Sequence, residues 1–111
     1  MPTSKSKNIA VKDLIQVFES QFFKAMAEPV RIDILKFILI NGRSDIATVA
    51  KTIKKDRSVI SRHLHIMVEA GLLSYEKVSR NSYFEIDGKE LRTKVYTLFQ
   101  KVDSAINNCC S

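Results

Sequence analysis

Apolar residues recur at helical spacing along the first part of the chain. They follow one another at intervals of three and four residues, which places them on one helix face, and the stripe consists of Val11, Ile15, Phe18 and Phe22. This spacing predicts a first helix that ends near Ala27. The preceding residues, 1–9, are polar and basic, and we expect them to form a disordered tail.

Two more helices are predicted before the middle of the chain. Glu28-Pro29 is typical of a helix start, because proline fits the first helical position, and the residues after it are apolar on nearly all sides. We therefore expect a buried second helix that ends at Asn41-Gly42. Ser44-Asp45 supplies capping side chains for a short third helix, which carries Ile46, Val49, Ala50 and Ile53.

A fourth helix has one apolar and one polar face. It follows the basic turn Lys54-Lys55, is capped by Asp56 and is expected to end at Ala70-Gly71. On a helical wheel, one side collects Val59, Ile60, His63, Leu64 and Met67. The opposite side collects Ser58, Ser61, Arg62, His65 and Glu69. We expect the first face to pack in the core, with His63 hydrogen-bonded there, and the second to bind a partner.

The periodicity then changes from helical to alternating. Residues 73–78 and 82–86 are predicted to be strands, and residues 79–81 between them form a hairpin turn. Asp87 with Glu90 three residues later is typical of a capping box at a helix start. The stripe of this last helix consists of Leu91, Val95, Leu98, Val102 and Ile106.

The order of these elements predicts a mainly α fold with a β-hairpin wing, a winged helix-turn-helix. We assign this domain to residues 10–107 and a C-terminal tail to residues 108–111. The first and last helices, with Phe23, Tyr96 and Phe99 beside their stripes, carry more apolar surface than such a small core can cover, which predicts a homodimer. The expected dimerisation residues are Val11, Ile15, Phe18, Phe22, Leu91, Val95, Leu98 and Val102.

Charge indicates the kind of partner. The 111-residue chain has 18 Lys and Arg against 12 Asp and Glu, a net charge of +6, which favours a polyanion. Hydroxyl and guanidinium groups at the start of the fourth helix are of the kind that contact base edges and phosphates in double-stranded DNA, and further cations flank them. The predicted DNA-binding residues are Lys54, Lys55, Arg57, Ser58, Ser61, Arg62, His65, Lys77 and Arg80.

Two stretches carry a family resemblance, residues 27–35 and residues 56–73. The second keeps the pattern Ser-x-His-Leu-x-x-Leu-x-x-Ala-Gly-Leu, except that Met67 takes the second Leu position. The chain thereby resembles the ArsR/SmtB family of bacterial repressors over about residues 10–105. The resemblance implies a dimer built on the first and last helices, which binds a palindromic operator and is released when an inducer is sensed.

The metal-sensing motifs of that family are not kept. Where metal-responsive members often carry Cys-x-Cys at the start of the third helix, this chain has Asp45 and Ala47. The zinc site of other members needs histidine near the C-terminus, and no His follows His65. His63 and His65 point to different sides of one helix, so they cannot share an ion. The residues therefore predict no metal site and no bound cofactor.

Cys109-Cys110 is the remaining candidate sensor. Two adjacent thiols suit a thiophilic metalloid or an oxidant, but arsenite takes three thiolates and one chain supplies two. A second subunit or an external thiol would have to complete such a site. The alternative is that the pair is a tail without function.

Other function classes fit the residues less well. An enzyme is not expected, because the chain has no Gly-rich phosphate loop and no nucleophile with a positioned base. A protein-protein adaptor is disfavoured by the basic outer face, whereas a constitutive DNA-binding regulator stays open. The apolar run 34–40 contains Lys36 and is too short to span a bilayer, and no secretory signal is recognisable. We expect a cytoplasmic protein without membrane contact.

Overall fold

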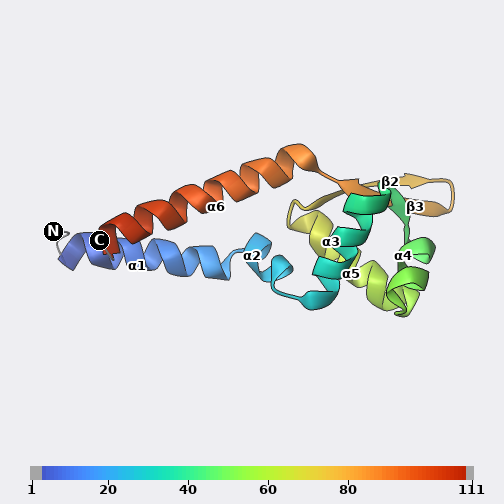
Figure 1. The fold of residues 1–111 in the computed structure, drawn as a ribbon, viewed down its shortest axis with the longest axis horizontal. Helices are drawn as coiled ribbons and strands as arrows, with labels where there is room; N and C mark the ends of the chain where they lie inside the picture. The colour runs from blue at the N-terminus through green and yellow to red at the C-terminus, as the bar shows by residue number, and fades with distance from the viewer. Residues whose placement is uncertain (1–3, 110–111) are drawn as a thin grey trace.

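The computed structural model describes residues 4–109 and has a head and an arm (Figure 1). The head contains three helices and a small sheet. The arm contains the first and last helices, which pack side by side, and α2 joins the two parts. In chain order the elements are α1 (Ser4–Glu19), α2 (Gln21–Met26), α3 (Pro29–Asn41), β1 (Ser44–Asp45), α4 (Ile46–Ile53), α5 (Arg57–Glu69), β2 (Leu73–Val78), β3 (Asn81–Ile86) and α6 (Gly88–Cys109).

The core of the head is formed by the inward faces of its helices and sheet. From α5 it receives Ile60, Leu64 and Met67, the apolar face that the wheel predicted, and all three are fully buried. Fully or almost fully buried residues of the other elements surround them: Ile34, Ile38, Val49, Leu72, Leu73 and Phe84. Each such side chain contributes about 1.5–3 kcal/mol relative to an exposed one. The orientation of α5 is therefore fixed by burial of one face.

The sheet is antiparallel with the strand order β1-β3-β2. β2 and β3 form the predicted hairpin, in register with Tyr75 opposite Phe84, although β3 begins one residue earlier than expected, at Asn81. The third strand was not predicted. Ser44 and Asp45 pair with β3, and Asp45 also caps α4 as expected, because its carboxylate accepts a hydrogen bond of 3.0 Å from the backbone N–H of Thr48.

The first helix differs from its prediction at both ends. It begins at Ser4, so residues 4–9, expected as a tail, belong to α1; residues 1–3 lie outside the described part. It ends at Glu19 instead of near Ala27, because Ser20 starts a separate short helix. The Ser20 hydroxyl accepts a hydrogen bond of 3.2 Å from the backbone N–H of Phe23 and donates one of 2.7 Å to the Val17 carbonyl. A side chain that satisfies both helix ends stabilises this break.

The break moves Phe22 out of the predicted dimer stripe. Because α2 starts afresh at Ser20, Phe22 is not in phase with α1 and instead lies in the head core, with 9% of its surface exposed. Leu91 and Leu98 of α6 likewise pack against that core, and Val102 is half-buried. These four residues, expected at a dimer interface, are largely committed to contacts within their own chain.

The arm makes the molecule elongated. Its extents are 57 × 24 × 21 Å and its radius of gyration is 17.3 Å, compared with about 13 Å for a compact domain of this size. Between α1 and α6 the buried residues are small, Ala10, Val17 and Ala105, which lets the helices approach. In the part of the chain that the structure describes, no helix is long and apolar enough to cross a membrane. α6 continues through residue 108, predicted as tail, to Cys109.

We expect Leu64→Ala to lower the free energy of unfolding by about 2–5 kcal/mol, because it leaves a cavity in the head core. The matched control is Leu39→Ala, since Leu39 is also helical but 60% exposed, and its effect should stay within about 0.5 kcal/mol. Urea unfolding at one fixed protein concentration measures both values. Equal losses would mean that α5 is not anchored by this face.

Candidate nucleic-acid interface

The N-terminal end of α5 presents the predicted reading face to solvent. Arg57, Ser58 and Arg62 are exposed, whereas Ser61 is half-buried beside the core. Asp56 stands at the N-cap position, but its side chain makes no capping hydrogen bond, unlike the prediction. Two guanidinium groups and a hydroxyl thus project from a rigid helix, as contacts to DNA bases and phosphates require.

The basic turn before α5 has a conformation set by α4. Lys54 is the C-cap of α4 in the left-handed conformation, with φ 62°, and its N–H donates a hydrogen bond of 2.9 Å to the Ala50 carbonyl. The N–H of Lys55 donates to the same carbonyl at 3.2 Å. Both side chains are exposed. α4, this turn and α5 make up the helix-turn-helix.

The wing carries the two remaining predicted cations. Lys77 lies on β2 and Arg80 in the turn at the hairpin tip, both exposed. Within residues 4–109, one ion pair has a nitrogen–oxygen distance below 4 Å, and it joins Arg43 Nη2 to Glu76 Oε2 at 3.2 Å. None of the predicted DNA-binding cations forms an ion pair in this part of the chain. Their charge is therefore available to a polyanion.

Arg43 is a basic residue between α3 and β1 that was not predicted to contact the wing. Its guanidinium carbon lies 4.5 Å from the centre of the Tyr83 ring, and its Nη2 pairs with Glu76. These contacts hold it against the sheet, so it supports the wing rather than offering a free charge.

His65 lies on the exposed side of α5, as predicted, and also contacts the wing. The imidazole ring packs edge-on against two aromatic rings of the hairpin, with its centroid 5.5 Å from that of Tyr75 and 5.6 Å from that of Phe84. Tyr75 and Phe84 are themselves 5.4 Å apart across the strand pair. This aromatic cluster joins α5 to the wing, so His65 also positions the helix relative to the hairpin, and its contact to DNA stays a prediction.

His63 is hydrogen-bonded inside the protein, as predicted. Its Nδ1 accepts a hydrogen bond of 3.2 Å from Nε of Arg31, whose Nη1 donates to the carbonyls of Lys24 at 3.3 Å and Ala25 at 3.5 Å. Arg31 therefore ties α2 to α5. Burial of His63, together with the positive charge of Arg31, lowers the pKa of the imidazole below 6.5. The neutral imidazole is the form that accepts this bond.

Of the positions considered for inducer sensing, the structure describes Asp45 and Cys109 but not Cys110. Asp45, at the place of a family cysteine, uses its carboxylate to cap α4, and the hydrogen bonds from Thr48 lower the pKa of this carboxyl. Within the described ranges, no group of three or more His, Cys, Asp or Glu side chains could hold a metal ion. Cys109 is the last residue of α6, and Cys110 lies outside the described residues. Sensing by this pair stays a prediction.

A short helix, a turn, a second helix with an exposed polar face and an antiparallel hairpin define a winged helix-turn-helix DNA-binding domain. The sequence model of the arsR family of bacterial regulatory proteins matches residues 28–75, which include the helix-turn-helix. An uncharacterized HTH-type transcriptional regulator of Methanocaldococcus jannaschii is 32% identical over 71 residues, 63% of this chain and 80% of that protein. This chain belongs to the arsR family of transcriptional regulators.

Two further comparisons agree in sequence and fold. The arsenical resistance operon repressor of Bacillus subtilis is 26% identical over 102 residues, which cover 88% of this chain and 94% of that protein. The homodimeric winged helix-turn-helix DNA-binding domain from Mycobacterium bovis superposes with a TM-score of 0.60, at 21% identity and over 93% of this chain and 90% of that one. The likeness to the second shows the fold.

We expect the stability of the protein to decrease as the pH falls below about 6.5. Because the pKa of folded His63 lies below that ordinary value, the unfolded state takes up the proton more readily. The stabilisation is complete above pH 6.5 and is lost as the pH falls through the lower pKa of the folded protein. Urea unfolding between about pH 8 and about pH 5 measures this slope.

The slope should flatten in His63→Gln, whose side-chain oxygen can accept the hydrogen bond of Arg31 but does not titrate. His65→Gln is the matched control, because it removes a histidine of the same helix without touching this bond, and it should keep the slope. A wild-type slope in His63→Gln would contradict the assignment.

Proposed function

We propose that the protein is a homodimeric transcriptional repressor that inserts α5 into the major groove of a palindromic operator. The observation that carries this proposal is the exposed, basic N-terminal end of α5, flanked by the unpaired cations of the turn and the wing. In this proposal Lys54 and Lys55 contact the phosphates before the helix, and Lys77 and Arg80 contact those beside it. Arg62 and Ser58 lie where base edges would be read.

The exposed faces of the arm support the dimer. α1 exposes Val11, Ile15 and Phe18, three of the predicted interface residues. On α6 the exposed apolar residues are Val95, Tyr96, Phe99 and Ile106. Together they form apolar surface on a thin projection, where a single chain has nothing left to cover it. A two-fold dimer through the arms would bury this surface and set two α5 helices for successive turns of DNA.

The repressor role is inferred from the kind of relative that the chain resembles, one of which is named an operon repressor. A repressor needs a way to leave its operator, so we include release by an inducer, for which Cys109-Cys110 is one candidate. A constitutive DNA-binding regulator would share every feature of the interface and differ in lacking this response. A protein adaptor would not need unpaired cations around α5.

DNA binding is tested with a duplex from upstream of the protein's own gene and a random duplex of equal length. Arg62→Ala should weaken binding to the upstream duplex at least about tenfold and binding to random DNA much less, because a bidentate base contact is lost. Lys55→Ala should weaken both about equally and reduce the salt dependence of binding. Fluorescence anisotropy over a salt series measures these affinities.

Lys12→Ala is the control, since Lys12 is an exposed lysine on the arm, and it should leave both affinities near the wild-type values. Binding by wild type that is absent or independent of salt would refute the DNA-binding proposal. Equal effects of Arg62→Ala and Lys55→Ala on both duplexes would mean that α5 does not read bases.

The dimer is tested with Phe99→Asp, because Phe99 is 64% exposed and its replacement should not disturb the fold of one chain. Sedimentation at micromolar concentration should show a dimer for the wild type and a monomer for this variant. Ile40→Asp introduces the same charge at a residue that is 82% exposed on the head, and it should remain dimeric. A monomeric wild type would overturn the dimer.

A further inference from the structure

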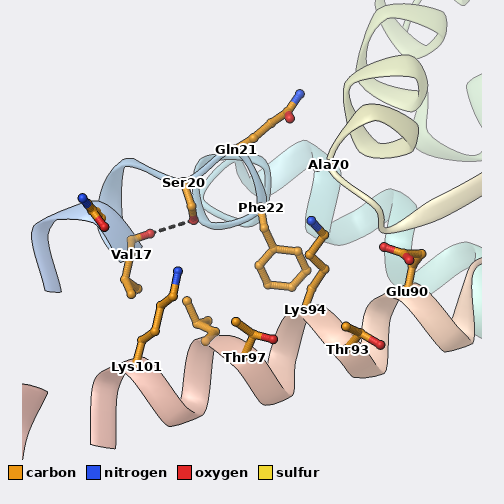
Figure 2. Close-up of a pocket in the computed structure, with 12 residues that line it drawn as sticks. Val17, Ser20, Gln21, Phe22, Ala70, Glu90, Thr93, Lys94, Thr97 and Lys101 are labelled. Atoms are coloured by element: carbon orange, nitrogen blue, oxygen red, sulfur yellow. Dashed lines mark hydrogen bonds between the residues drawn. The ribbon is translucent and has the colours of Figure 1, made fainter. Parts of the chain in front are cut away.

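A cleft of about 280 Å³ lies where the arm meets the head (Figure 2). Its walls come from the end of α1, from α2, from the residue that follows α5 and from one face of α6. Lys101 of α6 lies toward one end of the cleft, and Lys94 of the same helix lies beside the ring of Phe22 (Figure 2). Three elements far apart in sequence thus build one site.

The lining combines positive charge with an apolar floor. Lys94 and Lys101 are not ion-paired within the described part of the chain, and Glu90 is the one acidic residue among the twelve that line the cleft. Hydroxyl and amide side chains contribute most of the remaining polar atoms, whereas Phe22 and Leu98 supply apolar surface. Two ammonium groups around an apolar floor are complementary to an anion with a hydrocarbon body.

We propose that this cleft binds a small organic anion, a carboxylic acid with a short apolar body, and that its binding is coupled to DNA binding. The apolar body lies on Phe22 and Leu98, and the carboxylate accepts hydrogen bonds from Lys101 and the Thr97 hydroxyl. The volume of about 280 Å³ lies just below the usual range of ligand sites, about 300–1,000 Å³, which suits a ligand no larger than a single-ring acid. The coupling, unlike the binding, rests on the proposed function.

The coupling follows from what the cleft touches. Ala70, the C-cap of α5, lines it directly. Lys94 lies over the next residue, Gly71, so closely that a Cβ added there would be 3.2 Å from Lys94 Cε. A ligand whose apolar body lies on Phe22, beside the Lys94 side chain (Figure 2), displaces that side chain and so changes the packing at the C-terminal end of α5. The same ligand touches α2 and α6, and in the proposed dimer through the arms a shift of α6 relative to α2 would change the distance between the two α5 helices.

The proposed dimer leaves the cleft accessible. At about 100° per residue on an ideal helix, the cleft-lining residues of α6 fall on one side; these are Glu90, Thr93, Lys94, Thr97 and Lys101. The exposed apolar residues Val95, Tyr96, Phe99 and Ile106 fall on the other. An apolar side chain of a second copy is also a poor match for a lining with two unpaired lysines. A small anion from solution is therefore the occupant that the chemistry favours.

The test titrates the full chain with benzoate at up to millimolar concentration and follows backbone amides by NMR. Benzoate should shift the amides of residues that line the cleft, such as Ser20 and Thr97, and saturate. Benzamide has the same shape without the charge and should bind about tenfold more weakly or worse. Absence of saturable shifts with benzoate, or equal binding of benzamide, would overturn the site.

Lys101→Gln should weaken benzoate binding about tenfold, because it removes one charged donor from an exposed position without disturbing the core. Lys89→Gln is the matched control on the same helix, outside the cleft, and it should bind benzoate like the wild type. Unchanged binding by Lys101→Gln, in a protein whose amide spectrum is otherwise native, would also overturn the site.

Coupling is measured separately, as the affinity for the upstream duplex with and without benzoate at matched ionic strength. Benzoate should change this affinity in the wild type, Lys101→Gln should need about tenfold more benzoate for the same change, and saturating DNA should change the benzoate affinity by the same factor. An unchanged affinity would overturn the coupling and leave the site. Failure of the wild type to bind DNA at all would overturn the proposed function, while the NMR titration would still decide on the cleft.

Discussion

Burial of one face of α5 is the interaction on which the rest of this structure depends. Ile60, Leu64 and Met67 are fully enclosed by the head, and a helix anchored along three of its turns cannot rotate without exposing them. The opposite face, with Arg57 and Arg62, is thereby held outward. The same anchoring fixes the C-terminal end of the helix, where it meets the arm. Both the exposed basic end of α5 and the end that lines the cleft thus take their positions from the core.

Two polar or aromatic contacts connect this anchored helix to its neighbours. Arg31 links α5 to α2 through His63, and His65 links α5 to the wing through Tyr75 and Phe84. The two histidines leave opposite sides of the helix, so one helix is braced on both flanks. A movement of α2 relative to α6 would therefore change the hydrogen bond between Arg31 and His63, whereas the wing would move together with α5. These contacts therefore connect the arm to the exposed face of α5 through residues of the protein alone.

Features that depend on residues close together in the sequence were predicted more accurately than features that depend on contacts between distant residues. Helix faces and the hairpin followed from spacing, so the buried residues of α5 and the antiparallel strands were predicted correctly. The break at Ser20 was missed, because an apolar stripe continues through it and only the capping bonds reveal a new helix. The same error placed Phe22 at an interface instead of in the core. The contact of the His65 ring with Tyr75 and Phe84 was not predicted, because it depends on how the hairpin packs against α5.

By itself, the sequence determined which residues face inward, which helix carries free basic groups and to which family the pattern is similar, because period, charge and motif are properties of neighbouring residues. Only the tertiary structure decided the pairing of β1 with β3, the bond between Arg31 and His63 across 32 positions and the meeting of Phe22 with Lys94 and Lys101 around one cleft. These features depend on how finished elements pack against one another. Spacing along the chain does not record that packing, because many arrangements of the same helices bury the same faces.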